Sequence, residues 1–191
     1  MATYLFALMA WVFPSALAPI NLENQQTFIL IIFLVTFLLP AINIGLFKVM
    51  GTIQSVTMVD RKERIIPFLF ITAIYGIITY LFYSKTKMDL SDNFLRLMLV
   101  IDLLVLISTL CTFFFKISVH SVGIWGLVGM LVLLTKMTAL NSLLYISLGL
   151  IVLAGIIMSA RLQLGVHSSR EVMWGSIVGL VTGVVGMLVL F

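Results

Sequence analysis

Long apolar stretches that contain almost no charge constrain the fold of this chain more than any other feature of its sequence. Of its 191 residues, 62% are hydrophobic and 9% are charged, whereas a soluble domain carries roughly 25% charged residues. So few charged side chains cannot cover a water-facing surface. The stretches are long enough to cross a bilayer as helices, and they lack the alternating pattern of an outer-membrane barrel. The sequence therefore predicts an all-α, polytopic transmembrane helical bundle.

Seven stretches have the length and composition of membrane segments. We expect six core spans and one extra N-terminal segment, at residues 3–20, 27–50, 66–84, 93–115, 119–136, 143–160 and 170–191. The connections between these segments are short, so we expect a single transmembrane domain over residues 1–191. Within it, residues 1–50 form the N-terminal helices and residues 60–186 the core.

Prolines and glycines mark local features of these segments. Pro19 follows Ala16-Leu17-Ala18 directly, which argues against signal-peptide cleavage, so we expect the first segment to be retained. A re-entrant segment is the alternative, because two prolines interrupt it. We expect Pro40 to kink the second segment. The last segment carries glycines at four-residue intervals, a pattern that predicts close packing of another helix against Gly175, Gly179 and Gly183.

Cysteine content and net charge exclude several classes of protein. The single cysteine, Cys111, excludes an intrachain disulfide and a cysteine-based metal cluster. The net charge is +4, but the basic residues are few and scattered among apolar segments, which argues against a nucleic-acid partner. Bases at helix ends also interact with lipid headgroups. We therefore expect membrane lipids as partners.

Polar residues collect in three clusters, at residues 60–64, 116–121 and 161–171. Two predicted spans separate the first cluster from the second, and two more separate the second from the third. Each pair of crossings returns the chain to the same side of the membrane, so we expect all three clusters on one face. The chain has two histidines, His120 and His167, and both belong to these clusters.

The third cluster has the spacing of a histidine oriented by a carboxylate. His167 and Glu171 are four residues apart, which places them on one helical face if the last helix begins near His167. The carboxylate then accepts a hydrogen bond from one imidazole nitrogen and leaves the lone pair on the other. Arg161 and Arg170 flank the pair. Several arginines around a histidine suit a phosphate group.

Each of these residues also has a simpler, structural interpretation. Arg61, Lys62 and Arg64 suit a solvated loop that follows the positive-inside tendency. Ser118 suits the N-cap of the fifth segment, and Glu171 suits the first turn of the last helix. These readings leave the convergence of both histidines on one face unexplained.

The third and second clusters resemble motifs of the type 2 phosphatidic acid phosphatase and vanadium haloperoxidase superfamily. The third motif of that family is Ser-Arg, five residues, His, three residues, Asp; this chain has Ala160-Arg161, five residues, His167, three residues and Glu171. The second motif, Pro-Ser-Gly-His, is similar to Ile117-Ser118-Val119-His120, which keeps the serine and the histidine.

The first motif of the family is only partly present. Its pattern is Lys, six residues, Arg-Pro, whereas Arg64 is separated from Pro67 by two isoleucines, and Thr57 stands at the position of the lysine. Arg61 or Lys62 is a substitute for that cation. The resemblance covers residues 60–186 in order and topology.

The resemblance implies a metal-independent membrane phosphatase without a cofactor. His167 would attack phosphorus and form a phosphohistidine, with Glu171 orienting the imidazole, and His120 would act as general acid and then assist water attack. The phosphoryl oxygens would be held by Arg64, Arg161 and Ser118, with Arg61 or Lys62 in support. Glu171 stands where the family has aspartate, so its arm is one methylene longer.

The resemblance also implies a lipid phosphate or a polyprenyl diphosphate as substrate, and a site on the outer face of a bacterial inner membrane. Positive-inside counting favours the opposite orientation. Two other functions are open. One is an inactive family member that binds or transports a lipid phosphate. The other is a prenyltransferase-like enzyme, because Asp60-Arg61-Lys62 is similar to an Asp-rich diphosphate motif, although no second Asp-rich loop is present to hold magnesium.

Overall fold

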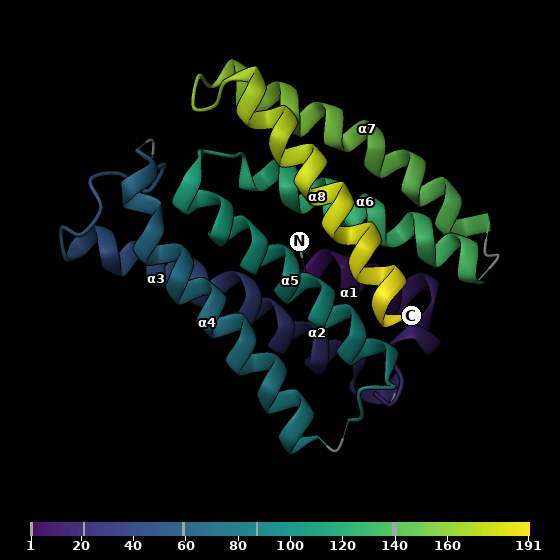
Figure 1. Ribbon diagram of the computed structural model, residues 1–191. Coiled ribbons are helices and arrows are strands. Elements are labelled where there is room, and N and C mark those ends of the chain that lie inside the picture. The colour runs from purple at the N-terminus through teal and green to yellow at the C-terminus, as the bar shows by residue number, and fades with distance from the viewer. Residues whose placement is uncertain (1, 21, 59, 87, 139–140) are drawn as a thin grey trace. The chain divides into compact units, whose positions relative to one another are not determined.

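A computed structural model describes residues 2–20, 22–58, 60–86, 88–138 and 141–191 of the chain (Figure 1). The structure is 84% helical, and the described residues contain no strand. Six helical segments in those ranges are long and apolar enough to cross a membrane: Gln25–Val49, α4 (Arg61–Lys85), α5 (Asn93–Phe114), α6 (Val119–Thr138), α7 (Asn141–Gln163) and α8 (Ser169–Leu190). The all-α, polytopic fold class is therefore confirmed.

The extra N-terminal segment is shorter than the expected 3–20. Its helix α1 (Ala2–Val12) has 11 residues, about 16 Å at the α-helical rise, whereas the hydrocarbon core of a bilayer is about 30 Å thick. Pro14 ends it, because the residue before a proline is forced out of the helical conformation; Phe13 accordingly has φ −144° and ψ 67°. A short 3₁₀ turn, η1 (Pro14–Leu17), follows. The extra N-terminal segment is therefore present as a short apolar helix followed by a turn, which alone is too short to cross the bilayer.

The predicted distortion at Pro40 takes the form of a widened turn. The span Gln25–Val49 consists of α2 (Gln25–Phe33), a π-helical turn η3 (Leu34–Leu38) and α3 (Leu39–Val49). Proline has no N–H to give to the carbonyl four residues earlier, which belongs to Thr36. The hydroxyl of Tyr75 in α4 donates to that carbonyl at 2.8 Å. A neighbouring helix thus satisfies the backbone group that Pro40 leaves without its usual donor.

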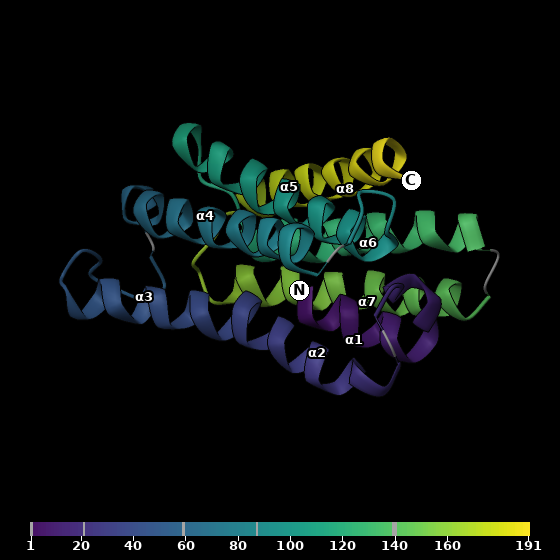
Figure 2. The ribbon, with the colours of Figure 1, turned by 90° about the horizontal axis from the view of Figure 1, so that it is seen from below.

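The chain divides into two compact units, Met1–Val105 (unit 1) and Leu106–Phe191 (unit 2), with the boundary inside α5. Unit 1 contains an aromatic core in which the ring of Phe94 contacts three other rings, with centroid distances of 4.9 Å to Phe6, 4.8 Å to Phe28 and 5.2 Å to Phe82. Unit 2 contains α6, α7 and α8, and α6 and α7 run antiparallel side by side (Figures 1 and 2). The single domain expected over residues 1–191 stays a prediction.

Helices α6 and α8 of unit 2 pack backbone against backbone. A Cβ atom added at Gly175 would lie 2.7 Å from the carbonyl oxygen of Ser118. One added at Gly179 would overlap the carbonyl of Val122, and one at Gly183 the carbonyl of Gly126. The predicted close-packing face on the last helix is therefore confirmed, and its partner is α6. Small residues allow this approach in a membrane, where packing is a main source of helix association.

We expect Gly179→Ala to destabilise unit 2, because the atom that the new methyl meets is a backbone carbonyl, which cannot rotate away. The expected loss is about 1–3 kcal/mol, the usual cost of overpacking, measured as a lower melting temperature in detergent. Gly149→Ala in α7 is the matched control, since a Cβ there meets nothing within 4 Å and alanine favours a helix. Equal melting temperatures for the two variants would contradict the packing argument.

Candidate functional site

The second and third polar clusters meet where α6 and α8 begin. The backbone N–H of Ser118 donates to the backbone carbonyl of Glu171 at 3.1 Å. Ser118 is fully buried, directly precedes α6, and its hydroxyl accepts a hydrogen bond from Ser121 Oγ at 3.0 Å. These two clusters therefore lie together, as the count of spans predicts. Ser121 was not among the expected site residues; its only sequence signal is its place within the second cluster.

The start of α8, close to His167 as expected, brings His167 and Glu171 together through its N-cap. The helix begins at Ser169, with Ser168 as an extended N-cap (φ −80°, ψ 160°) whose hydroxyl accepts from Glu171 N at 3.4 Å. His167 therefore lies before the cap rather than on the helix. The expected i, i+4 contact is present, with His167 just before the N-cap and Glu171 in the first turn of the helix. The cap turns the chain so that the residue before it lies over the first turn.

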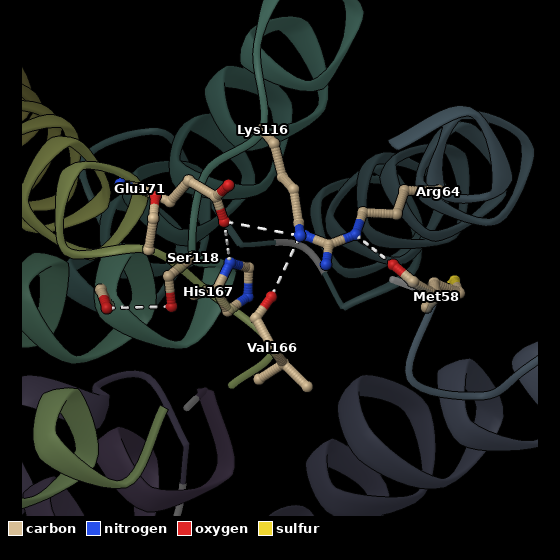
Figure 3. Close-up of polar contacts among 9 residues, drawn as sticks. Met58, Arg64, Lys116, Ser118, Val166, His167 and Glu171 are labelled. Carbon is tan, nitrogen blue, oxygen red and sulfur yellow. Dashed lines mark hydrogen bonds and ion pairs between the residues drawn. The ribbon is translucent and has the colours of Figure 1, made fainter. Parts of the chain in front are cut away.

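The two side chains nevertheless make the expected contact. His167 Nδ1 and Glu171 Oε2 are 2.7 Å apart (Figure 3), the length of a charge-assisted hydrogen bond. A carboxylate only accepts, so Nδ1 donates, and in the neutral imidazole the lone pair is then on Nε2. The His167 side chain is 2% exposed and that of Glu171 22%. This arrangement is that of a histidine nucleophile or base oriented by a carboxylate.

Lys116, the first residue of the second cluster, contacts the His167–Glu171 pair, although it was not among the expected site residues. Its Nζ donates to the carbonyl of Val166 at 3.0 Å and lies 3.6 Å from Glu171 Oε2 (Figure 3). Its position could have indicated this in the sequence, because it stands two residues before Ser118, in a polar stretch between two apolar spans. The cluster thus holds one lysine, one carboxylate and one imidazole in direct contact.

Arg161 ends up in the last turn of α7, six residues before His167. Its Nε is buried and has no hydrogen-bond partner within the part of the chain that the structure describes. A buried donor without an acceptor is costly, so an anionic ligand at this guanidinium would be stabilising. Arg170, in contrast, is exposed in the first turn of α8.

His120 lies in the first turn of α6 and is exposed. It follows Ser118 by two residues, at the same end of α6 as the His167–Glu171 pair. Its expected role as a general acid stays a prediction.

The residues of the first cluster belong to unit 1 and form a helix start rather than the solvated loop considered above. Asp60 is the N-cap of α4 and accepts from Lys62 N at 3.1 Å. Lys62 is exposed, whereas Arg64 is 5% exposed and its Nε donates to the carbonyl of Met58 at 2.7 Å (Figure 3). Arg61 lies in the same first turn. Binding of phosphoryl oxygens by Arg61, Lys62 and Arg64 stays a prediction.

Fold and site together define a multi-pass helical membrane protein with a His–Glu–Lys cluster at one end of α6 and α8. Compared with family models, with curated proteins and with solved structures, the chain gave no match. Within the described ranges, no three His, Cys, Asp or Glu side chains are grouped so as to hold a metal ion.

The contact between His167 and Glu171 gives a test at Glu171. For the phosphatase activity that the sequence resemblance implies, we expect Glu171→Gln to lower turnover of a phosphate ester by ~10³–10⁴-fold, since loss of the orienting carboxylate has such effects in histidine-based sites. Glu171→Asp keeps the negative charge near the imidazole but on a shorter arm, so it should lose less turnover than Glu171→Gln. Turnover and melting temperature are measured for both variants in detergent.

Glu23→Gln, which removes an exposed carboxylate in η2 (Leu22–Asn24), is the control for a general effect of charge. If Glu171 only favours the helix N-terminus, both Glu171 variants lose at most ~1 kcal/mol of stability and turn over normally. Normal turnover in Glu171→Gln would remove the residue from the site.

Proposed function

We propose that this chain is an integral membrane phosphatase that hydrolyses a lipid phosphate or lipid diphosphate through a phosphohistidine. The proposal includes membership of the type 2 phosphatidic acid phosphatase superfamily, on the strength of the motif spacing given above. The observation that carries it is the 2.7 Å contact between His167 Nδ1 and Glu171 Oε2. That contact leaves Nε2 with the lone pair that attack on phosphorus requires.

In the proposed reaction, Nε2 of His167 forms a bond to phosphorus while the bond from phosphorus to the leaving oxygen breaks. His120 gives a proton to that oxygen. Glu171 stabilises the positive charge that develops on the imidazole. In the second step His120 takes a proton from water, the water oxygen attacks phosphorus, and the phosphorus–nitrogen bond breaks to release inorganic phosphate and neutral His167.

Two groups of unit 2 are the proposed ligands of the phosphoryl oxygens. The Arg161 guanidinium is permanently charged and its buried Nε lacks an acceptor among the described residues. Ser118 is held in place by its backbone bond to Glu171 and by Ser121. Such preorganised donors stabilise the charge on phosphoryl oxygens in the transition state.

A lipid substrate follows from the place of the cluster in the fold. His167 and Glu171 lie at the start of α8, and Ser118 at the start of α6, and both helices are membrane spans. The ends of spanning helices lie near the headgroup region. A substrate whose phosphate reaches this level while its tail stays in the bilayer fits this position, as phosphatidate and polyprenyl diphosphate both do.

A protein that binds or transports a lipid phosphate without hydrolysis is the second candidate. Two observations favour it: the His167 side chain is 2% exposed, and the Nε of Arg64 is engaged with a backbone carbonyl. Release of inorganic phosphate from a lipid phosphate by the purified protein separates the two candidates. The prenyltransferase-like alternative ranks below both, because capping of α4 accounts for Asp60.

We expect His167→Ala to abolish phosphate release from dioleoyl phosphatidate, because the nucleophile is gone, while the melting temperature in detergent changes little. Orthovanadate should inhibit the wild type, since pentacoordinate vanadate resembles the transition state of phosphoryl transfer, and a metal chelator should leave the activity unchanged. Wild-type rates in His167→Ala would refute the assignment of the nucleophile. Insensitivity to vanadate would count against the phosphohistidine.

We further propose that the cluster faces the outside of a bacterial inner membrane. A cysteine at Ser169, an exposed first residue of α8, in a Cys111→Ser background should react with an impermeant maleimide in intact spheroplasts. A cysteine at Asn141, the exposed first residue of α7 at the other end of α6, should react only after permeabilisation. The reverse pattern would place the cluster in the cytoplasm.

A further inference from the structure

Lys116 is in direct contact with both segments that form the His167–Glu171 pair. Its Nζ donates to the carbonyl of Val166, the residue before His167, at 3.0 Å. The same Nζ lies 3.6 Å from Glu171 Oε2, the oxygen that accepts from His167. Figure 3 shows the ammonium and the imidazole both directed at this carboxylate oxygen. Lys116 therefore lies beside the reacting group that the proposed function assigns.

Exposure differs within this cluster. The side chains of Lys116 and Glu171 are 23% and 22% exposed, whereas that of His167 is 2% exposed. An anion that approaches from water therefore meets the ammonium before it meets the imidazole. The carboxylate of Glu171 alone would repel a phosphate group at this point, and the ammonium offsets that repulsion.

The ammonium of Lys116 can also form a further hydrogen bond. A lysine Nζ carries three N–H donors. Among the described residues, its contacts are one hydrogen bond to Val166 and one ion pair at 3.6 Å, which is longer than a good N–H···O bond. A phosphoryl oxygen can therefore bind Nζ without loss of the bond to Val166.

We propose that Lys116 is a phosphate-binding residue of this site, which holds the anionic phosphoryl group of the substrate beside His167. The inference rests on the proposed function for the identity of the substrate, but it concerns binding alone. The competing explanation is that Lys116 is only a brace that ties the segment before α6 to the segment before α8. A brace affects stability, whereas a ligand affects affinity for phosphate.

The experiment measures binding in a His167→Ala background, where turnover is absent. The probes are dioleoyl phosphatidate in detergent micelles and inorganic phosphate, with dioleoylglycerol as the lipid that lacks the phosphate, and affinities come from calorimetry. Adding Lys116→Met should weaken phosphatidate binding by about tenfold or more, the usual effect of losing a charge-assisted hydrogen bond. Lys116→Arg in the same His167→Ala background should keep most of the affinity for phosphatidate.

Lys136→Met is the matched control, because it removes an exposed lysine from the last turn of α6, at the far end of the same helix. If Lys116→Met does not fold, Lys116→Gln takes its place, since its amide still offers a donor but no charge. Binding of inorganic phosphate in parallel with phosphatidate assigns the effect to the phosphoryl group. Binding of phosphatidate but not of inorganic phosphate, with the same dependence on Lys116, assigns it to the phosphate of a lipid headgroup.

Two results of the binding experiment would overturn the inference. One is a lower melting temperature with unchanged phosphatidate affinity, the signature of a brace. The other is equal binding of dioleoylglycerol and phosphatidate, or no binding of either. The proposed function fails differently: a wild type that binds phosphatidate through Lys116 but releases no phosphate is a binding protein. If the wild type and Lys116→Met both release phosphate with the same KM, the protein is a phosphatase in which Lys116 is not a ligand.

Discussion

The close approach of α6 and α8 is the constraint on which the rest of unit 2 depends. Glycines at 175, 179 and 183 let the backbone of α8 touch the carbonyls of Ser118, Val122 and Gly126. The same contact continues beyond the helix starts, where Ser118 N–H reaches the carbonyl of Glu171 at 3.1 Å. A side chain on this face would separate the helices and break that bond. The position of the polar cluster is thus a consequence of packing inside the membrane.

Much of this architecture can be predicted from the sequence, because the bilayer restricts the options. Hydrocarbon thickness fixes the length of each span, and every backbone group inside it needs a partner. The six core spans follow from these two conditions, and so does a distortion at Pro40. The partner of the Thr36 carbonyl, Tyr75 of another helix, does not follow, because it depends on which helices are neighbours. The early end of α1 could be predicted from the sequence, because Pro14 disfavours a helical conformation at the residue before it.

Within the candidate site, the contact of His167 with Glu171 could be predicted from the sequence, whereas the cap that makes it could not. The spacing of His167 and Glu171 indicated a contact if the last helix begins near His167, and the helix begins at Ser169. The contact arises from the extended N-cap Ser168. Lys116 is not distinguished by its sequence alone, because a lone lysine between two spans is usually a headgroup anchor. Only its distances to Val166 and Glu171 distinguish it from such an anchor.

The geometry of the cap also explains the length of the acidic side chain at position 171, where the family that the chain resembles has aspartate. The backbone of this residue is held on both sides, by Ser168 Oγ at its N–H and by Ser118 N–H at its carbonyl. It therefore cannot move toward His167 without loss of the helix cap or of the α6–α8 contact. The length of the side chain has to cover the remaining distance, and glutamate reaches Nδ1 at 2.7 Å. An arm shorter by one methylene, about 1.5 Å per C–C bond, would stop short of the imidazole unless His167 moved. In this chain the longer acid is accordingly the residue that fits the cap, and Glu171 is compatible with an oriented histidine.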